Sequence, residues 1–318
     1  MNCERKSLLE YVNCNLCGAD DAMLLYLSTL PKDRCFQDDV QSFRCTSSGY
    51  GVHPPIVQCR SCGLVYANPR YEKNAILHNY EEAIDRLYMD EREGRVLTFR
   101  RNLSPLEKLV RPVSARKLLD IGCHIGVFLE IAQERGWEAW GIEPSRWATE
   151  QAQRRGLRVT ASILEEAGFT DEFFDVVTMW DVIEHLTDPT NELQEVNRVL
   201  KKGGLICIHT MNIESLFARL MGPRWPWLME MHLYYFSPCT LAKMLEKTGF
   251  QVIQTITQGR FLRLGYLISR FEPYSKRASR LLQRLAEALW LMGAPVPINL
   301  GDLFTTYARK TMECPPHR

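Results

Sequence analysis

Two glycines and a later glutamate have the spacing of a site for an adenosine-containing cofactor. Gly122 and Gly126 interrupt the run KLLDIGCHIGVFLEIA, and glycines in a turn let backbone amides approach a ligand with which a Cβ would clash. Glu143 lies 21 residues after Gly122. At that separation, a carboxylate at the end of a second strand accepts hydrogen bonds from both hydroxyls of a ribose. The pattern therefore predicts a strand, turn, helix and strand that hold an adenosine group.

The glycine spacing does not fit a nicotinamide dinucleotide. The G-x-G-x-x-G pattern requires glycine at positions 122, 124 and 127, and the chain has His124 and Val127 at the last two. Read as G-x-G-x-G, the run matches at Gly122 and Gly126, with His124 in the middle. For the turn taken alone, an ordinary tight turn of an α/β protein stays an alternative.

Three side chains that can exchange protons or bind a cation follow the fourth expected strand. Asp181, Glu184 and His185 stand at i, i+3 and i+4, so on a helix they would share one face. The carboxyl ends of the strands are where open α/β sheets bind ligands, which makes His185 a candidate general base. His232 is the second candidate. The alternatives are that these side chains only tie down their loops, or that Asp181, Glu184 and His185 hold a divalent cation.

Two C-x-x-C-G segments near the start of the chain have the spacing of a metal site. Cys14 and Cys17 form the first pair, and Cys59 and Cys62 the second. The pairs are separated by 41 residues, so an inserted hairpin or loop must lie between them. We expect a structural Zn²⁺ with four cysteine ligands and no open position. Disulfides are the alternative, but the chain has 11 cysteines, an odd number, and its charged first residues do not resemble a secretion signal.

Apolar runs alternate with helical segments around these residues and predict an α/β fold. Strands are expected at 118–121, 139–142, 157–160 and 176–179, and another follows the Gly203-Gly204 turn. Ser237 and Pro238 are residue types preferred at a helix N-terminus, which predicts a helix that ends before Gly249 and a strand beyond it.

In their order and spacing, these segments resemble the class I S-adenosylmethionine-dependent methyltransferases. The resemblance covers about residues 80 to 260. It implies a Rossmann-like sheet of seven strands with helices on both faces, in which 302–310 is the antiparallel seventh strand, and S-adenosyl-L-methionine as the methyl donor. It also implies a subgroup with an N-terminal zinc-binding domain. The motifs are D-I-G-C-x-x-G-x-F-L (120–129), E-P-S (143–145), D-V-x-E-H (181–185), L-K-x-G-G (200–204) and H-x-Y-Y-F-S (232–237).

The resemblance also implies the cofactor contacts. The turn 122–126 would hold the methionine end, and Glu143 the ribose. Many relatives have aspartate where Ile163 stands, so that side-chain hydrogen bond is expected to be absent. At His124, which occupies a usual glycine position, either the backbone is ordinary for an L-residue or the site tolerates a side chain near the cofactor carboxylate. The expected cofactor residues are Asp120, Gly122, His124, Gly126, Glu143, Pro144, Ser145, Ile163, Leu164, Trp180 and Asp181.

Composition and patterning divide the chain into parts. With 39 basic and 38 acidic residues and a net charge of +1, it has no bulk electrostatic reason to bind nucleic acid. We expect a zinc module over 1–70, a connecting helical region or lid over 71–113, a methyltransferase domain over 114–311 with a helical insertion at about 260–298, and a disordered tail over 312–318. In the lid, Tyr88 or Arg92 would approach the methionine carboxylate.

The segment 261–292 is amphipathic and basic, and no apolar run in the chain is long enough to span a bilayer. Such a segment can lie on an anionic membrane as a peripheral contact, cover an acceptor pocket, or pack against the sheet, which we favour. The sequence thus predicts a cytoplasmic methyltransferase for a small-molecule or glycan-related acceptor, such as a nucleotide- or lipid-linked sugar, by analogy with relatives. The alternatives are methylation of a quinone-like phenol, methylation of RNA, and a non-catalytic zinc-stabilised binding protein.

Overall fold

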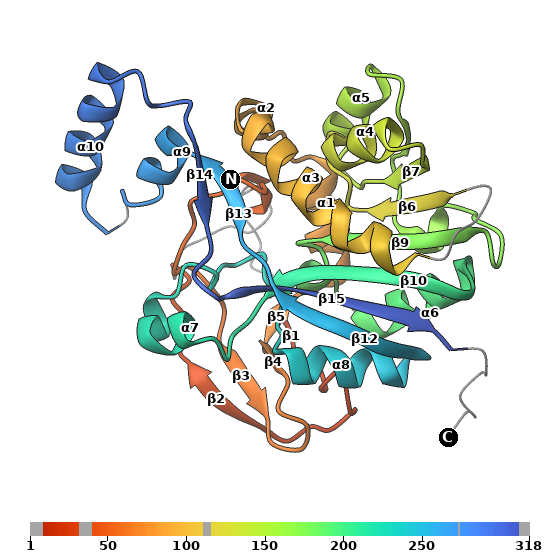
Figure 1. Cartoon of the computed structure of the whole chain (residues 1–318). Coiled ribbons are helices and arrows are strands. Elements are labelled where there is room, and N and C mark those ends of the chain that lie inside the picture. The colour runs from red at the N-terminus through yellow and green to blue at the C-terminus, as the bar shows by residue number, and fades with distance from the viewer. Residues whose placement is uncertain (1–8, 32–39, 111–115, 273, 312–318) are drawn as a thin grey trace, which may run out of the picture.

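A seven-stranded sheet forms the centre of the computed structural model, which describes residues 9–31, 40–110, 116–272 and 274–311 (Figure 1). The order is β12-β15-β10-β9-β6-β7-β8, and β15 runs in the opposite direction to the other six strands of this sheet. The predicted α/β sheet with an antiparallel closing strand is therefore confirmed. The strands are β6 (Lys117–Ile121), β7 (Glu138–Ile142), β8 (Arg158–Thr160), β9 (Phe174–Trp180), β10 (Leu200–Met211), β12 (Phe250–Thr257) and β15 (Leu303–Lys310).

Adjacent residues of the central strands supply separate cores on the two faces of this sheet. Successive strand residues point to opposite faces, so Leu118 and Val176 enter one core, and Leu119 and Val177 enter the other. Helices α3 (Arg92–Leu109), α4 (Val127–Glu134) and α5 (Arg146–Gln153) cover the first face. Helices α6 (Pro189–Val199) and α8 (Pro238–Lys247) cover the second.

The predicted start of α8 is confirmed. The Ser237 side chain accepts a hydrogen bond from the backbone N–H of Thr240, the Thr240 side chain caps in return, and Pro238 occupies the first turn. The helix that we expected across Asp181, Glu184 and His185 is absent from this described segment. Asp181 has a φ of 57°, and a single turn, η4 (Ile183–His185), follows it. The left-handed residue turns the chain, so the three side chains do not share a helix face.

The N-terminal region forms a second, four-stranded sheet in the order β11-β4-β3-β2. Its strands β2 (Ala22–Tyr26), β3 (Ile56–Cys59) and β4 (Val65–Ala67) come from the cysteine-bearing segment, and β2 and β3 are the pair expected between the two cysteine motifs. The fourth strand, β11 (Tyr234–Tyr235), comes from the middle of the chain and pairs antiparallel with β4. Strands β1 (Leu9–Glu10) and β5 (Arg70–Tyr71) pair beside it, and η2 (Val40–Phe43) precedes the turn at Cys45.

Helices and a ribbon complete the structure around the carboxyl edge of the main sheet. Helices α1 (Lys73–Glu81) and α2 (Arg86–Asp90) lead into α3, and α7 (Leu216–Met221) and η5 (Gly222–Arg224) follow β10. The insertion between β12 and β15 is a two-stranded ribbon, β13 (Arg260–Arg263) with β14 (Pro295–Ile298), that carries α9 (Leu264–Ser269) and α10 (Lys276–Ala288).

Helix α10 packs on α9 and stands away from the main sheet, so the packing that we favoured for this segment is wrong (Figure 1). Among the described residues, no helix is long and apolar enough to cross a membrane. The expected tail 312–318 lies outside the described residues, and the predicted domain boundaries stay a prediction.

Candidate functional site

The turn after β6 has the backbone of a cofactor loop. Gly122 and Gly126 have φ values of 67° and 81°, a region that favours glycine. A Cβ on Gly122 would lie 2.7 Å from the Val182 side chain. Asp120, at the end of β6, accepts a 2.6 Å hydrogen bond from Thr178 Oγ1, and burial raises the pKa of Asp120 to about 8.

His124 has a left-handed backbone conformation. Its φ is 49°, which rules out the first of the two alternatives, an ordinary L-residue conformation; the second, a side chain tolerated near the cofactor carboxylate, stays a prediction. The imidazole is buried and stacks on the Tyr88 ring at 3.7 Å between centroids. Its Nδ1 has no hydrogen-bond partner within the described part of the chain. The Arg95 guanidinium lies over the other side of this stack, 3.5 Å from the Tyr88 centroid.

Glu143 is fixed by two backbone amides. Its Oε2 accepts from the His124 N–H and its Oε1 from the Ser145 N–H, both at 2.9 Å. Burial raises the pKa of Glu143 to about 7, against the lowering effect of these two hydrogen bonds. Each oxygen keeps a lone pair, so the carboxylate can still accept from ribose hydroxyls.

The helices expected as a lid contact the segments that follow β6 and β7. Ser145 caps α5 and also donates a 2.9 Å hydrogen bond from its Oγ to the Ala83 carbonyl oxygen, which lies between α1 and α2. Tyr88 of α2 stacks on His124 of the turn 122–126, whereas Arg92 pairs with Glu130 at the surface and Arg95 faces the cavity. The approach of Tyr88 or Arg92 to the methionine carboxylate stays a prediction. Five more expected cofactor residues lie along this covered edge of the sheet, outside the lining of the cavity described next: Gly126, Glu143, Pro144, Ile163 and Leu164.

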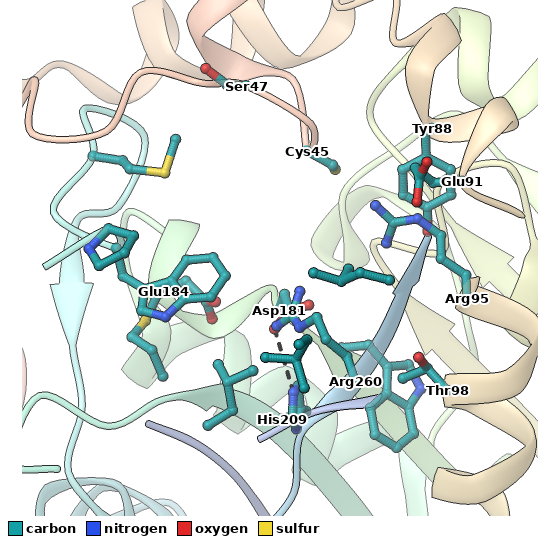
Figure 2. A pocket seen from close by; sticks show the side chains of 18 of the residues that line it. Cys45, Ser47, Tyr88, Glu91, Arg95, Thr98, Asp181, Glu184, His209 and Arg260 are labelled. Carbon is teal, nitrogen blue, oxygen red and sulfur yellow. Dashed lines mark hydrogen bonds and ion pairs between the residues drawn. The ribbon is translucent and has the colours of Figure 1, made fainter. Parts of the chain in front are cut away.

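One cavity joins the cofactor turn to a chamber built from distant parts of the chain (Figure 2). Seven expected site residues line it. Asp120 and Trp180 lie at the ends of β6 and β9, and the segments after these strands contribute Gly122, His124, Asp181 and His185. The loop before β11 contributes His232. The opposite wall includes Cys45, Ser47 and Tyr50 of the N-terminal region, Trp227 and Met231 of the loop before β11, and Arg260, Tyr266 and Arg270 of the insertion.

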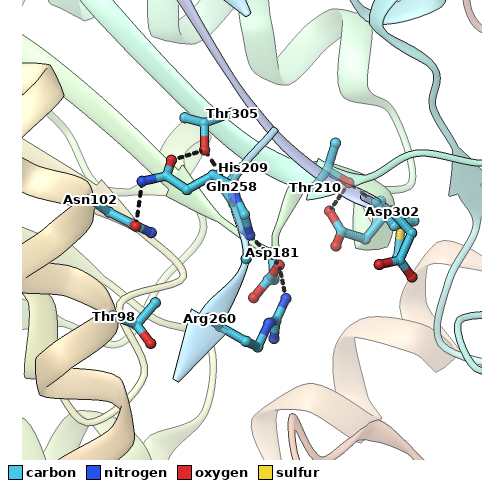
Figure 3. Close-up of polar contacts among 12 residues, drawn as sticks. Thr98, Asn102, Asp181, His209, Thr210, Gln258, Arg260, Asp302 and Thr305 are labelled. Carbon is cyan, nitrogen blue, oxygen red and sulfur yellow. Dashed lines mark hydrogen bonds and ion pairs between the residues drawn. The ribbon is translucent and has the colours of Figure 1, made fainter. Parts of the chain in front are cut away.

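Asp181 connects the core to the insertion (Figure 3). Its Oδ1 lies 3.0 Å from Arg260 Nη2 and 3.8 Å from His209 Nε2. Burial acts to raise the pKa of Asp181, but the charges of Arg260 and His209 outweigh it and lower the pKa below its usual value. The Arg260 guanidinium also lies 5.2 Å from the Trp227 ring centroid. The same carboxylate therefore orients a cation that faces the cavity.

Glu184, His185 and His232 form a second cluster in the same cavity. Their candidate ligand atoms lie within 4.8 Å of one another, and the two imidazole centroids are 4.8 Å apart. Burial lowers the pKa of His185 to about 4 and that of His232 to about 3, so both rings are neutral near pH 7. Burial raises the pKa of Glu184 to about 8, and Thr210 Oγ1 donates a 2.8 Å hydrogen bond to its Oε2. The cluster that could exchange protons or hold a cation thus includes His232 in place of Asp181.

The four expected cysteine ligands meet at one point. Their Sγ atoms lie within 4.8 Å of one another; Cys14 and Cys62 are 3.4 Å apart, and Cys17 and Cys59 are 3.5 Å apart. Four sulfurs at about 2.3 Å from a tetrahedral Zn²⁺ would be about 3.8 Å apart, so the donor set fits the metal. Burial acts to raise the pKa of the Cys59 thiol, but the N–H groups of Cys62 and Ser61 point at it and lower its pKa to about 7.

Sequence reasoning missed several residues of the cavity. Arg95, Arg260 and Arg270 are spread over two helices and a ribbon, and no motif marks them. Cys45 and Tyr50 belong to a segment that we had assigned only to the metal module. Tertiary contacts, rather than local sequence, bring these residues together. They meet because β11 and β13 bring the N-terminal region and the insertion to the same edge of the sheet.

Comparisons with known proteins show that the chain is similar to methyltransferases. Residues 81–255 match a family described as "Methyltransferase domain". Proteins named "Ubiquinone biosynthesis O-methyltransferase" from Aeromonas salmonicida and Ruegeria pomeroyi are 29% identical over 151 residues and 37% identical over 111 residues. These matches cover 43% and 32% of this chain, but 63% and 44% of the relatives' own lengths. A SAM-dependent methyltransferase of known structure from Archaeoglobus fulgidus aligns with 71% of this chain and all of its own, at 21% identity and a TM-score of 0.48.

Proposed function

We propose, on the premise that this chain belongs to the S-adenosylmethionine-dependent methyltransferase family, that it methylates an oxygen of a phenol-like acceptor related to quinones. The family match covers more than half of the chain. The names of its relatives favour the quinone alternative over the glycan-related acceptor that the sequence suggested first. The observation that carries the proposal is that a single cavity contains both the cofactor turn and two neutral histidines.

The lining of the acceptor chamber suits an aromatic ring. Tyr50, Phe217, Trp227 and Tyr266 line it, together with several methionines and leucines. Aromatic and aliphatic walls are typical of sites for small apolar ligands. Arg95, Arg260 and Arg270 also line this cavity, so its wall combines apolar side chains with cations.

His232 is the side chain best placed to accept the proton of an acceptor hydroxyl. Its Nδ1 lies 2.7 Å from the carbonyl oxygen of Trp227, and a carbonyl oxygen only accepts, so this nitrogen carries the hydrogen. Nε2 is then the lone-pair nitrogen. By the same argument His185 carries its hydrogen on Nδ1, because the Met231 carbonyl oxygen lies 3.0 Å from that nitrogen; the Tyr80 hydroxyl also contacts it at 2.8 Å, so this ring is held by two partners.

Glu184 complements this base. When it bears a negative charge, it stabilises a neighbouring imidazolium, and its raised pKa lies in the working range of such an enzyme. When bound, the cofactor supplies an activated methyl group on a sulfonium; the residues of the chain align the two reactants and take up the proton that the acceptor oxygen loses. The same cluster has the donor types of a divalent cation site, which is the second role that its geometry supports.

We further propose that the four cysteines hold a structural Zn²⁺. The sulfur geometry, the left-handed glycines at Gly18 and Gly63 after each pair, and the N–H groups that point at Cys59 support it. A thiolate site of this kind suits a reducing compartment, and on that ground we propose a cytoplasmic location.

Calorimetry with S-adenosylmethionine, followed by transfer assays with catechol and hydroquinone probes, tests the proposal. We expect binding and transfer by the intact chain, and transfer reduced about 100-fold or more in His232→Ala, the usual range for a general base. His78→Ala, which changes an exposed histidine of α1, is the matched control. Binding without transfer to any phenol, but with transfer to RNA or to a lipid-linked sugar, would contradict the acceptor class. No binding at all would favour a non-catalytic zinc-stabilised protein.

A further inference from the structure

Helix α10 presents an uncovered apolar face. Leu281, Leu285 and Leu289 recur every four residues and are all exposed, with Leu285 52% exposed. The side of the helix that packs on α9 is made of small residues instead: Ser279 and Ala286 are buried, and Ser279 Oγ donates a hydrogen bond to the Ile268 carbonyl oxygen. A soluble helix normally turns its leucines inward and its small polar residues outward, and α10 does the reverse.

Exposed apolar side chains also follow α10 and lie on α7. Trp290, directly after α10, is 93% exposed. On the neighbouring α7, Leu216 and Leu220 are 72% and 77% exposed. Figure 1 shows α7 and α10 on the same side of the molecule. The Tyr274 hydroxyl, just before α10, donates to the Arg224 carbonyl oxygen in the turn after α7, so the two regions are joined.

The parts of the chain that carry the exposed leucines also contribute to the lining of the cavity. Phe217 of α7 and Leu262 and Leu267 of the insertion line it. The exposed leucines and part of the apolar lining therefore belong to the same two parts of the chain.

Cations flank the apolar face of α10. Lys276, Arg277, Arg280 and Arg284 share the helix with a single acidic residue, Glu287. Over the part of the chain that the structure describes, no ion pair is recorded for these four cations, unlike Arg100, Arg146 and Arg154 elsewhere on the surface. Leucines bordered by unpaired basic side chains complement an anionic lipid surface, where the leucines enter the acyl boundary and the cations contact headgroups.

We propose that α10, with Trp290 and the exposed leucines of α7, docks the chain on an anionic lipid bilayer, so that an acceptor dissolved in the membrane enters the cavity directly. The delivery of an acceptor rests on the proposed function, but the docking does not. Lipid is the occupant that the charges favour, because a second copy of the chain would set the same four cations against each other.

Co-sedimentation of the full chain with vesicles tests the docking. Phosphatidylcholine vesicles containing phosphatidylglycerol should bind the chain at least tenfold more tightly than pure phosphatidylcholine vesicles, and added salt should weaken this binding. Leu281→Asp with Leu285→Asp should reduce binding at least tenfold. The matched control is Leu24→Asp with Leu27→Asp, a pair of exposed leucines in the N-terminal region.

A second pair of variants tests the charges. Arg277→Gln, Arg280→Gln and Arg284→Gln together should reduce binding to the anionic vesicles, whereas the same change at Arg135, Arg146 and Arg154 should not. Each variant is first shown by calorimetry to bind S-adenosylmethionine as the unaltered chain does. If the unaltered chain does not bind S-adenosylmethionine, the proposed function is contradicted. If it binds S-adenosylmethionine but not the vesicles, only the docking is contradicted.

Two results would overturn the proposal. The first is cofactor binding by the unaltered chain with no preference for anionic vesicles. The second is a stable dimer in solution that Leu281→Asp with Leu285→Asp dissociates, without vesicle binding, because the leucine face would then be an interface between two copies of the chain.

Discussion

The two walls of the cavity are built in different ways. The cofactor wall, together with the segment after β7 that adjoins it outside the cavity lining, is formed at the carboxyl ends of β6, β7 and β9, and its residues are fixed by local turns and backbone hydrogen bonds, as at Glu143. The acceptor wall has no such local origin. It combines residues 45–50, 226–232 and 260–270, which meet only in the folded protein.

The attachments of the acceptor wall to the core are also unequal. Asn15, inside the first cysteine pair, contacts Asp188 and Thr190 at the start of α6, and Arg70 donates to the Thr187 carbonyl oxygen. The N-terminal part is thus attached to the core at several points, whereas α10, within the insertion, packs on α9 and stands away from the main sheet. The difference indicates that the cysteine module determines the shape of the acceptor chamber and that the end of the insertion is free for other contacts.

Removing the metal ligands should have the largest effect. Cys59→Ser with Cys62→Ser is expected to abolish zinc binding, which in small zinc domains supplies about 10 kcal/mol or more of folding free energy. The N-terminal sheet should then lose its order, and with it β11 and the neighbouring His232. Metal analysis, thermal unfolding and transfer assays measure the three consequences. Cys239→Ser, an exposed cysteine on α8, should change none of them.

That experiment also tests the dependence of one wall on the other. If the cofactor wall is independent, the double variant should retain part of its affinity for S-adenosylmethionine while losing transfer. A metal-free preparation could unfold at the same temperature as the zinc-loaded chain and transfer methyl groups as fast. That result would contradict a role of the metal in holding the acceptor wall in place.

Glu143→Gln tests the cofactor wall. The substitution should weaken cofactor binding by about 100-fold, since two hydrogen bonds from hydroxyls to a carboxylate are each worth about 1.5 kcal/mol or more. Calorimetry measures the affinity, and Glu150→Gln on the exposed face of α5 is the control. Unchanged affinity would show that Glu143 does not bind the ribose.

The same residue predicts a pH dependence without cofactor. The folded pKa of Glu143, about 7, exceeds the usual value, so the folded state favours the neutral carboxyl. The contribution to stability is complete below about pH 4.3, the value for the unfolded chain, and is lost as the pH rises through 7. Relative to Glu143→Gln, the unaltered chain should lose up to ~3 kcal/mol of unfolding free energy between pH 4 and pH 8. A constant difference over this range would contradict the burial of the charge.

Arg260→Gln tests the junction of the two walls and should have the smallest effect. Cofactor affinity should stay within about twofold, while kcat/KM for the acceptor should fall about tenfold, which corresponds to one charged hydrogen bond. Without Arg260, the pKa of Asp181 should rise, so the acidic limb of the pH profile should move to higher pH. Arg277→Gln on α10 is the control. A loss of cofactor affinity as large as the loss of kcat/KM would show that Asp181 and Arg260 belong to the cofactor wall.

The sequence predicted the cofactor wall better than the acceptor wall, for a physical reason. A turn such as 122–126 and a cap such as Ser237 depend on residues a few positions apart, so their types and spacing reveal them. The seven-stranded sheet and its antiparallel seventh strand were predicted from the family resemblance that these local signals supported. His124 was recognised as a departure, but its stack on Tyr88, which comes from a separate helix, could not be read from the turn alone.

The acceptor wall depends on contacts between distant segments. Nothing near Arg260 marks it as the partner of Asp181, and nothing near Cys45 marks it as part of the cavity. The amphipathic pattern of α10 was correctly recognised, but the pattern is the same for a helix that faces the core and for one that faces away from it. Only the position of α9 shows which side is covered.

Strand β11 has a consequence for the order of events during protein synthesis. Strand β11 pairs with β4, and the hydrogen bond from Arg70 to the Tyr234 hydroxyl joins residues 164 positions apart. The N-terminal sheet is therefore incomplete when it leaves the ribosome, and one edge of β4 stays open until much of the main sheet has been made. A chain that stalls or is cut before residue 234 would keep this edge exposed, so truncated products should aggregate through their N-terminal region rather than through the unfinished main sheet.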